Sequence, residues 1–252
     1  MLMSENQREI IESLISYGLE LHKRPREKIT FSMNPESDNY LNDIETYPHF
    51  FVLGCVMDRQ VKAWRAWLIP YKISQSVGGV EFSDFLTLDL PKTIAIFNEQ
   101  SLHRMPTKMA QCFFDAVQRL HTEYSDNAGN IWTRGNPSSR EVIDRFARFN
   151  GVGQKISTMA TNILVRDFKV PLRNISSIDI SVDIQIDRVF KRLGLVPKRA
   201  SKIDIIQTAR ELYPQYPGVF DSVCWEIGEA WCKPEYQQCE KCFMKKNCPK
   251  II

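Results

Sequence analysis

Three kinds of group that could act together in chemistry lie between Phe149 and Arg188. Gly151 and Gly153 stand one residue apart, Lys155 follows two positions later, and a single carboxylate, Asp183, comes well downstream. Glycines let a backbone approach an anion closely, an amine can act as a nucleophile, and a carboxylate can stabilise positive charge. The combination indicates a backbone grip for an anion, a nucleophile and a charge stabiliser.

The two glycines fit a helix-hairpin-helix. A helix that ends at Phe149, a tight turn and a new helix from Gln154 would leave the first amides of the second helix pointing outward. These amides and the helix dipole favour an anion such as a DNA phosphate, and a contact through backbone carries no sequence information. A plain helix–helix turn fits Gly-Val-Gly equally well.

Lys155 and Asp183 are each ambiguous when taken singly. A lysine in the first turn of a helix is usually a solvated cation, although desolvation in a cleft would lower its pKa and make it a nucleophile able to form a Schiff base. A lone aspartate before a helix is more often an N-cap than a catalytic group. Neither residue defines an activity by itself.

Four cysteines crowd into the end of the chain. Cys232, Cys239, Cys242 and Cys248 have the spacing C-x6-C-x2-C-x5-C. In a reducing compartment such crowding indicates metal ligation rather than disulfides, and four thiolates can hold either a zinc ion or a [4Fe–4S] cluster. The other three cysteines, in apolar helical contexts, are expected in the core: Cys55, Cys112 and Cys224.

The composition is that of an ordinary globular protein. Of 252 residues, 43% are hydrophobic and 25% charged, and the net charge of +3 gives no global nucleic-acid footprint, so any basic surface must be local. No window approaches the roughly 20 apolar residues of a membrane span. Residues Met1 to Arg8 lack the pattern of a secretion signal, so we expect a cytoplasmic protein.

The elements that must position these residues are predicted to be mainly α-helical. Helical periodicity, capping pairs and prolines predict helices over residues 4–22, 49–68 (ended by Pro70), 106–124, 138–149, 154–166, 202–213 and 220–230, with one or two short helices in 82–97. The polar stretches 22–45 and 125–137 are predicted to be loops. Ile178, Ile180, Val182, Ile184 and Ile186 alternate strictly, which favours a strand and conflicts with the helical pattern after them.

Together these motifs resemble the endonuclease III-like DNA glycosylases of the helix-hairpin-helix superfamily. The cysteine spacing is that of the family's iron–sulfur cluster loop, and Phe149 to Lys155 is similar to its hairpin, L-P-G-V-G-x-K. Val182 to Val189 resembles its V-D-T-H-x-x-R-V segment, and Gly228 fits the helix that leads into the cluster. Each motif is weak alone, whereas three in the family's order are specific.

The resemblance implies a two-lobed fold. A six-helix barrel over residues 46–175 would carry the hairpin, and residues 1–45 with 176–252 would form a second helical lobe with the iron–sulfur loop. Asp183 would then begin a helix, against the strand-like alternation around it. The resemblance implies DNA contacts from the hairpin residues, Asn150, Gly151, Val152, Gly153 and Gln154.

The resemblance also implies an activity. A damaged or mispaired base in double-stranded DNA would be flipped out, because its glycosidic carbon cannot be reached inside the stack. Lys155 would attack C1′ and Asp183 would stabilise the developing charge, with β-elimination following. A structural [4Fe–4S] cluster, rather than zinc, would bind the four cysteines. We expect a monomer, in the nucleoid if the source is prokaryotic. The alternatives are a glycosylase without lyase activity and a non-catalytic iron–sulfur DNA-binding protein.

The chain also departs from the family pattern. Asn150 replaces the hairpin proline, Gln185 replaces the histidine after V-D-T, and an added segment, Lys169 to Ile180, precedes Asp183. The run from Leu53 to Gln60 has no clear counterpart of the family's gap-filling glutamine. We expect its members Val56, Met57, Asp58, Arg59 and Gln60 to help shape the lesion pocket or a wedge. These departures leave the base undefined.

Overall fold

The computed structural model describes residues 4–251, so Met1 to Met3 of the N-terminal stretch considered above lie outside it. The described residues form α-helices and one 3-10 turn, without any strand. A single antiparallel bridge joins Cys232 to Gln237. The prediction of a mainly α fold is confirmed. None of the described helices has the length and apolar character needed to cross a membrane.

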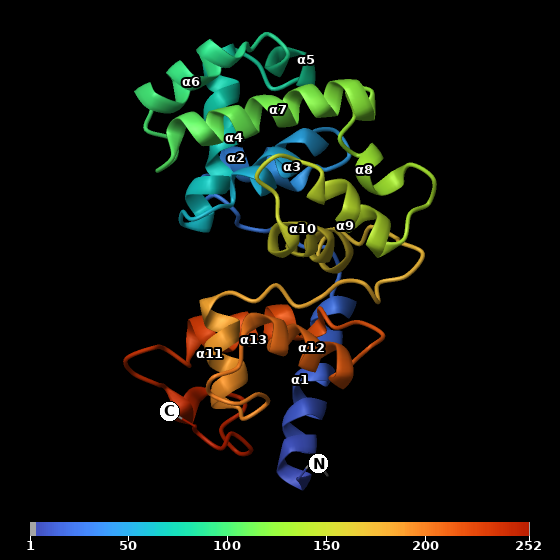
Figure 1. Ribbon diagram of the computed structural model, residues 1–252, viewed down its shortest axis with the longest axis vertical. Helices are drawn as coiled ribbons and strands as arrows, with labels where there is room; N and C mark the ends of the chain where they lie inside the picture. Colours follow the sequence, from blue (N-terminus) through green and yellow to red (C-terminus); the bar gives the residue numbers. More distant parts are fainter. Residues whose placement is uncertain (1–3, 252) are drawn as a thin grey trace. The chain divides into compact units, whose positions relative to one another are not determined.

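The chain divides into two compact units (Figure 1). Unit 1 consists of Met1–Pro25 and Asn174–Ile252, and unit 2 of Arg26–Arg173. Residues 26–45 were expected in the same lobe as residues 176–252, whereas in the structure they belong to unit 2. A helix in that stretch packs against two helices of unit 2.

Unit 2 is organised around one fully enclosed helix. All ten residues of α3 are buried, as expected for a helix that is apolar on every side. It contacts α2, α4, α7 and α10. The helices of this unit are α2 (Pro35–Asn42), α3 (Pro48–Met57), α4 (Ala63–Val77), α5 (Phe82–Phe85), α6 (Leu90–Glu99), α7 (Pro106–Tyr124), α8 (Asn130–Thr133), α9 (Ser139–Ala147) and α10 (Gln154–Arg166).

Unit 1 is held together by α13, which packs against both α1 and α11. A Cβ at Gly18 of α1 would lie 2.4 Å from the Val219 carbonyl oxygen, so glycine permits the close approach of α1 to α13. The elements of this unit are α1 (Glu5–Lys23), α11 (Ile184–Arg192), α12 (Lys202–Leu212), α13 (Val219–Ala230) and the 3-10 turn η1 (Cys239–Lys241).

The predicted helix over 49–68 is wrong, because the structure has two helices there. α3 ends at Met57, and the chain turns through Gln60 with φ +56° before α4 begins at Ala63. Pro70 does not end the helix but lies inside α4, where Pro70 and its neighbours Ile69 and Tyr71 are buried. The packing of this buried face outweighs the backbone hydrogen bond that proline removes.

The polar stretches contain two helices that the sequence did not indicate. Asn34 caps α2 inside the stretch 22–45, and α8 lies inside 125–137. The alternation over 178–186 forms no strand: residues 178–182 are all buried, and α11 starts at Ile184. The predicted core cysteines, Cys55, Cys112 and Cys224, are buried.

Candidate functional site

The hairpin between α9 and α10 has the predicted form. Gly151 adopts φ +88°, a conformation that side chains with a Cβ rarely tolerate. A Cβ there would also lie 3.0 Å from Sγ of Cys112, which belongs to α7. The turn itself therefore requires glycine at position 151.

Gly153 is glycine for a different reason. It is the N-cap of α10 with an extended backbone (φ −101°), and an added Cβ would meet no atom within 4 Å among the described residues. No side chain of the described chain caps α10, whereas Ser138 caps α9 and Asp183 caps α11. The start of α10 thus lacks a side-chain cap and has open space beside Gly153, two features of an anion-binding helix terminus.

Asn150 occupies the position of the family's hairpin proline and ties the hairpin to α7. Its Nδ2 donates to Oδ2 of Asp115 over 2.8 Å, and Gln111 donates to the other oxygen of the same carboxylate. The Asn150 side chain is therefore engaged by its own unit. The predicted contact of Asn150 with DNA must therefore use hydrogen-bonding groups that are not engaged with Asp115.

Lys155 lies in the first turn of α10 with an exposed side chain, and the next residue, Ile156, is buried. The structure of unit 2 alone does not desolvate this amine.

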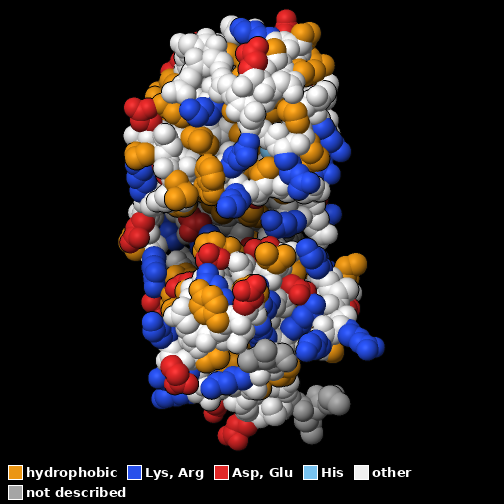
Figure 2. All heavy atoms as spheres, turned by 90° about the vertical axis from the view of Figure 1, so that its left-hand side faces the viewer, with side chains coloured by type: hydrophobic (Ala, Val, Ile, Leu, Met, Phe, Trp, Pro, Cys, Tyr) orange, Lys and Arg blue, Asp and Glu red, His pale blue; other side chains and the backbone are white. Residues whose placement is uncertain are grey.

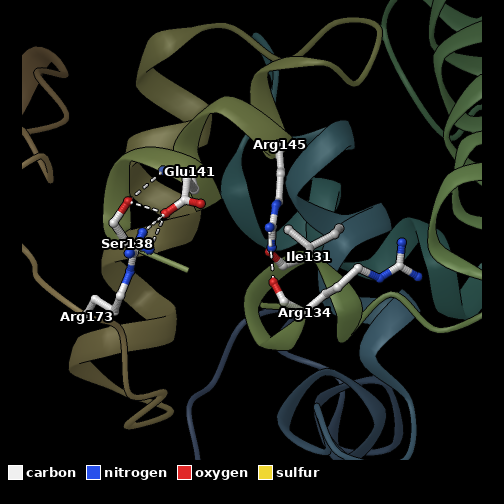
Figure 3. A network of polar contacts seen from close by, with 6 residues as sticks. All are labelled: Ile131, Arg134, Ser138, Glu141, Arg145 and Arg173. Atoms are coloured by element: carbon white, nitrogen blue, oxygen red, sulfur yellow. Dashed lines mark hydrogen bonds and ion pairs between the residues drawn. The ribbon is translucent and has the colours of Figure 1, made fainter. Parts of the chain in front are cut away.

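A network of polar contacts fixes α9, the first helix of the hairpin (Figure 3). Ser138 donates to Glu141 from its backbone N (2.8 Å) and from Oγ (2.7 Å), and Arg173 pairs with the same carboxylate. These contacts, the bonds from Ser138 first, lower the pKa of Glu141 to about 2. On the other side of α9, Arg145 donates to the carbonyl oxygens of Ile131 (2.9 Å) and Arg134 (3.1 Å). The network anchors α9 at both its start and its last turn.

Asp183 is the N-cap of α11. Its Oδ1 accepts from the backbone amides of Gln185 (2.8 Å) and Ile186 (2.9 Å). The helix that the resemblance implied at this position is confirmed. Among the described residues no hydrogen bond is made to Oδ2, so one oxygen of this half-buried carboxylate remains available.

The segment before Asp183 is fixed by contacts that the sequence did not reveal. Oδ1 and Oδ2 of Asp179 accept from Arg210 of α12 in a bidentate pair, both at 2.6 Å. The Ile178 carbonyl accepts from the amide of Gly218 over 2.7 Å. This part of the added segment is therefore an ordered, buried strap that leads into Asp183.

α11 also connects Asp183 to the first cysteine of the C-terminal loop. Nε of Arg188 donates to the Cys232 carbonyl (2.7 Å), and Arg192 donates to the Lys233 carbonyl (2.7 Å) and approaches Sγ of Cys232 at 3.4 Å. Gln185, in place of the family's histidine, donates to Glu229 and accepts from Arg188. Arg188 and Arg192 lie four residues apart, a spacing that places both on the same face of a helix. This spacing could have indicated in the sequence that the two act together.

The four predicted cysteine ligands line a single cavity. Apolar side chains close it on the other sides: Val189 of α11, Leu193 directly after α11, and Ile227 of α13. Burial raises the pKa of the Cys242 and Cys248 thiols, and the nearby cysteines add to the rise. As arranged, no group of three or more His, Cys, Asp or Glu side chains in the described chain could hold a single metal ion.

The lysines near the cysteines and the residues of the run Val56 to Gln60 differ in their exposure. Lys241, Lys245 and Lys246 beside the cysteines are exposed. On the face shown in Figure 2, lysine and arginine side chains are scattered among acidic ones, in line with the small net charge. Of the run predicted to shape a pocket, Val56 and Met57 are fully buried in the core, so this part of the prediction is corrected. The core of unit 2 encloses them.

Asp58 and Arg59 are half-buried and only Gln60 is exposed. Arg59 lies beside the hairpin, because its Nη1 would be 3.9 Å from a Cβ at Gly151. Within this run, only Asp58, Arg59 and Gln60 are accessible enough to contact DNA.

Comparison with solved structures identifies the fold. A trapped covalent intermediate of endonuclease III with DNA has a TM-score of 0.62 at 16% identity, covering 99% of this chain and 97% of that one. A thermostable thymine-DNA glycosylase has a TM-score of 0.61 at 14% identity, covering 98% and 96%. The chain therefore has the helix-hairpin-helix fold of the endonuclease III-like DNA glycosylases.

The sequence is similar to one protein of this kind. Endonuclease III of Thermotoga maritima is 28% identical over 109 residues, which are 43% of this chain and 46% of that protein. The match thus spans less than half the length of this relative. No protein-family profile matches the chain. The fold of the chain, and the sequence of less than half of it, are thus similar to those of endonuclease III.

Proposed function

We propose that this protein is a base-excision DNA glycosylase with an associated lyase activity. The observation that carries the proposal is the hairpin: an uncapped helix start at Gly153, open to a backbone phosphate, directly before an exposed lysine. One solved structure of this fold is a trapped covalent intermediate of endonuclease III with DNA, which supports the choice of chemistry.

In this proposal the hairpin holds a phosphate of duplex DNA through the amides at the start of α10. The damaged or mispaired base leaves the stack, and Nζ of Lys155 attacks C1′ as the glycosidic bond breaks and the base departs with the bonding electrons. Oδ2 of Asp183 stabilises the positive charge that develops at the sugar and assists deprotonation. The lysine adduct then permits β-elimination of the strand.

For the cysteines we propose a [4Fe–4S] cluster rather than zinc. A tetrahedral zinc ion with Zn–S bonds of ~2.3 Å would draw four sulfurs to within roughly 4 Å of one another. In a [4Fe–4S] cluster four cysteines share a larger group, so the sulfurs stand further apart. The four cysteines have the spacing of the iron–sulfur loop that the sequence resembles, and all four line one cavity, which supports the larger group. When bound, the cluster supports the loop and its DNA contacts, and the chemistry stays with Lys155 and Asp183.

Borohydride trapping tests the proposal. The wild-type protein is incubated with duplexes that carry an oxidised pyrimidine, 8-oxoguanine, mismatched uracil or thymine, or an alkylated purine, and with an abasic duplex. We expect base release from at least one of them and a covalent adduct after reduction, which Lys155→Ala abolishes. Lys191→Ala, which removes a lysine paired with Asp187 on α11, is the matched control and keeps the adduct.

Two other outcomes favour the alternatives. Base release without an adduct, unchanged in Lys155→Ala, would indicate a glycosylase without lyase activity. Binding to DNA with neither base release nor an adduct on any substrate would indicate a non-catalytic DNA-binding protein. We further propose that the protein acts as a monomer in the cytoplasm, or on the nucleoid in a prokaryote, and sedimentation with and without duplex DNA tests the monomer.

A further inference from the structure

Arginines gather where the ends of α7 and α9 meet beside the hairpin. Arg119 of α7 lies over the ring of Phe149, with its guanidinium carbon 5.8 Å from the ring centroid. Phe149 is the first residue of the hairpin turn, and Arg148, the C-cap of α9, directly precedes it. Two arginines from different helices thus flank the start of the hairpin.

Tyr124, at the end of α7, shows that these charges are close together. Its ring stacks on that of Phe149, with 6.2 Å between the centroids. Burial raises the pKa of the Tyr124 phenol, and the charges of Arg119 and Arg148 oppose that rise. Arg145, three residues before Arg148 on the same side of the helix, opposes it too. Three guanidinium groups are therefore near one buried tyrosine.

Acidic side chains neutralise this group of arginines only in part. The carboxylate of Glu123 also acts on the Tyr124 phenol, and it pairs with Arg119 over 2.5 Å. In the described chain, no acidic side chain forms an ion pair with Arg145 or Arg148. An excess of positive charge results at this place, although the net charge of the whole chain is only +3.

Arg145 and Arg148 differ in what engages them. Arg145 donates to the carbonyl oxygens of Ile131 and Arg134, as Figure 3 shows. The exposed side chain of Arg148 makes no hydrogen bond or ion pair within residues 4–251. Arg145 is therefore fixed in the protein, whereas the guanidinium of Arg148 has its donors available for a ligand.

Arg148 and the start of α10 lie on either side of one tight turn. The amide of Val152 donates to the carbonyl of Phe149 over 3.0 Å, and Gly153, the N-cap of α10, follows. The ends of such a four-residue turn are less than about 7 Å apart. Successive phosphates of one DNA strand rise ~3.4 Å along the duplex axis, so a phosphate at the start of α10 would have a neighbour on the side of Arg148.

We propose that Arg148, with Arg119 beside it, binds a second phosphate of the DNA strand that the hairpin holds. This inference rests on the proposed function, which places duplex DNA at the start of α10. A guanidinium group binds a phosphate through two parallel hydrogen bonds and keeps its charge at any pH at which the protein is folded. Contacts of this kind carry no sequence information, so this second phosphate site holds undamaged and damaged duplex equally. It serves the search along undamaged DNA and leaves the choice of lesion to other residues.

The salt dependence of binding tests the second phosphate site, using the full chain with its cluster. One duplex is undamaged and the other carries a tetrahydrofuran abasic analogue, and each is titrated at several salt concentrations between about 50 and 200 mM. We expect Arg148→Ala to reduce the slope of log K against log salt by about 0.9, the contribution of one phosphate contact. The affinity should fall by the same factor on both duplexes, so that their ratio stays within about twofold.

Matched variants separate a phosphate contact from a change in overall charge. Arg140→Ala removes the same charge earlier on α9, where Arg140 pairs with Asp144 over 3.0 Å, and should keep the slope of the wild type. Arg148→Lys keeps the charge and should restore the slope. Arg119→Gln should reduce the slope by less than Arg148→Ala does, because Glu123 already neutralises part of the charge of Arg119.

The outcomes distinguish this inference from the proposed function. If the wild type binds both duplexes but Arg148→Ala keeps its slope, or Arg140→Ala lowers the slope equally, the second phosphate site is refuted and the glycosylase proposal stands. A loss of affinity confined to the abasic duplex would also refute it, because Arg148 would then respond to the lesion. If the wild type binds neither duplex and releases no base from any lesion, both proposals fall together.

Discussion

At the scale of single residues, Gly151 and Gly153 show how one motif can combine a folding requirement with a binding requirement. Gly151 is fixed by its own turn, through its positive φ and its contact with Cys112. Gly153 has an ordinary backbone conformation and open space beside it. The sequence alone cannot distinguish a glycine required by the turn from a glycine that leaves room for a ligand, because both are simply glycine.

Substitution by alanine should separate the two glycines. Gly151→Ala should cost about 1–3 kcal/mol of folding stability, because alanine resists the left-handed conformation. Gly153→Ala should cost less, about 0.5–1 kcal/mol, because alanine is a poorer N-cap than glycine, and should weaken binding to duplex DNA, since its methyl group occupies the path of a phosphate. Denaturant unfolding and a DNA titration at fixed salt measure the two effects. Equal DNA affinity of Gly153→Ala and wild type would count against a phosphate at this helix start.

Asp183 likewise combines two roles on its two oxygens. Oδ1 caps α11 and Oδ2 is left for the proposed chemistry. Asparagine caps a helix about as well as aspartate but carries no charge. Alanine neither caps the helix nor carries a charge.

Asp183→Asn should therefore keep the stability of the wild type and lose base release, while Asp183→Ala loses base release and about 1 kcal/mol of stability as well. Thermal unfolding beside a single-turnover assay on the substrate found in the lesion panel measures both. Full base release by the asparagine variant would show that the charge of Asp183 has no part in the reaction.

At the scale of elements, the sequence predicts helices well where capping residues and one apolar face mark them. α9 and α10 illustrate this, and the start of α11 needed the family resemblance, because alternating isoleucines imitate a strand. The boundary between α3 and α4 was missed since a wholly buried helix has no polar face to mark its limits. α2 was missed because its capping asparagine lies in a stretch whose composition is that of a loop.

The candidate site was predictable to the extent that it is local in sequence. The hairpin, the cap at Asp183 and the four-cysteine cavity each follow from neighbouring residues. The pairs that fix them, Asn150 with Asp115 and Asp179 with Arg210, join residues of different elements. One sequence does not indicate such partners, because any exposed acidic or basic residue could have served.

The central helix α3 should make unit 2 sensitive to mild acid. His49 is buried and donates to the Val80 carbonyl, and burial lowers its pKa to about 4. Since the unfolded chain takes up the proton near pH 6.5, stability is complete above that pH and falls as the pH drops towards 4. Between pH 7.5 and pH 5 we expect a loss of about 2 kcal/mol from this residue.

Denaturant unfolding of His49→Gln at both pH values checks this, because the variant should lose that part of the pH dependence. His121→Gln, at an exposed histidine on α7, is the matched control and should retain it. Equal pH dependence in the wild type and His49→Gln would show that another group titrates.

At the scale of the whole molecule, the two units have different sources of stability. The large hydrophobic cluster of unit 2 draws its members only from residues 31–168. The C-terminal loop of unit 1 instead surrounds the cavity lined by its cysteines, and its first cysteine is held by arginines of α11. Loss of the proposed cluster should therefore affect the units unequally.

Removing one thiol at a time makes this measurable. Cys242→Ala should abolish the absorbance near about 400 nm that a [4Fe–4S] protein shows, and should expose residues 232–251 to proteolysis, because the remaining thiols line an apolar cavity without a ligand. Cys55→Ala removes a thiol from the core of unit 2 and should keep both the absorbance and the protected loop. In both variants amides of α3 should keep their hydrogen-exchange protection at pH 7.5. A colourless wild-type protein with one zinc per chain would refute the cluster, and faster exchange in α3 of Cys242→Ala would show that the stability of unit 2 depends on the loop.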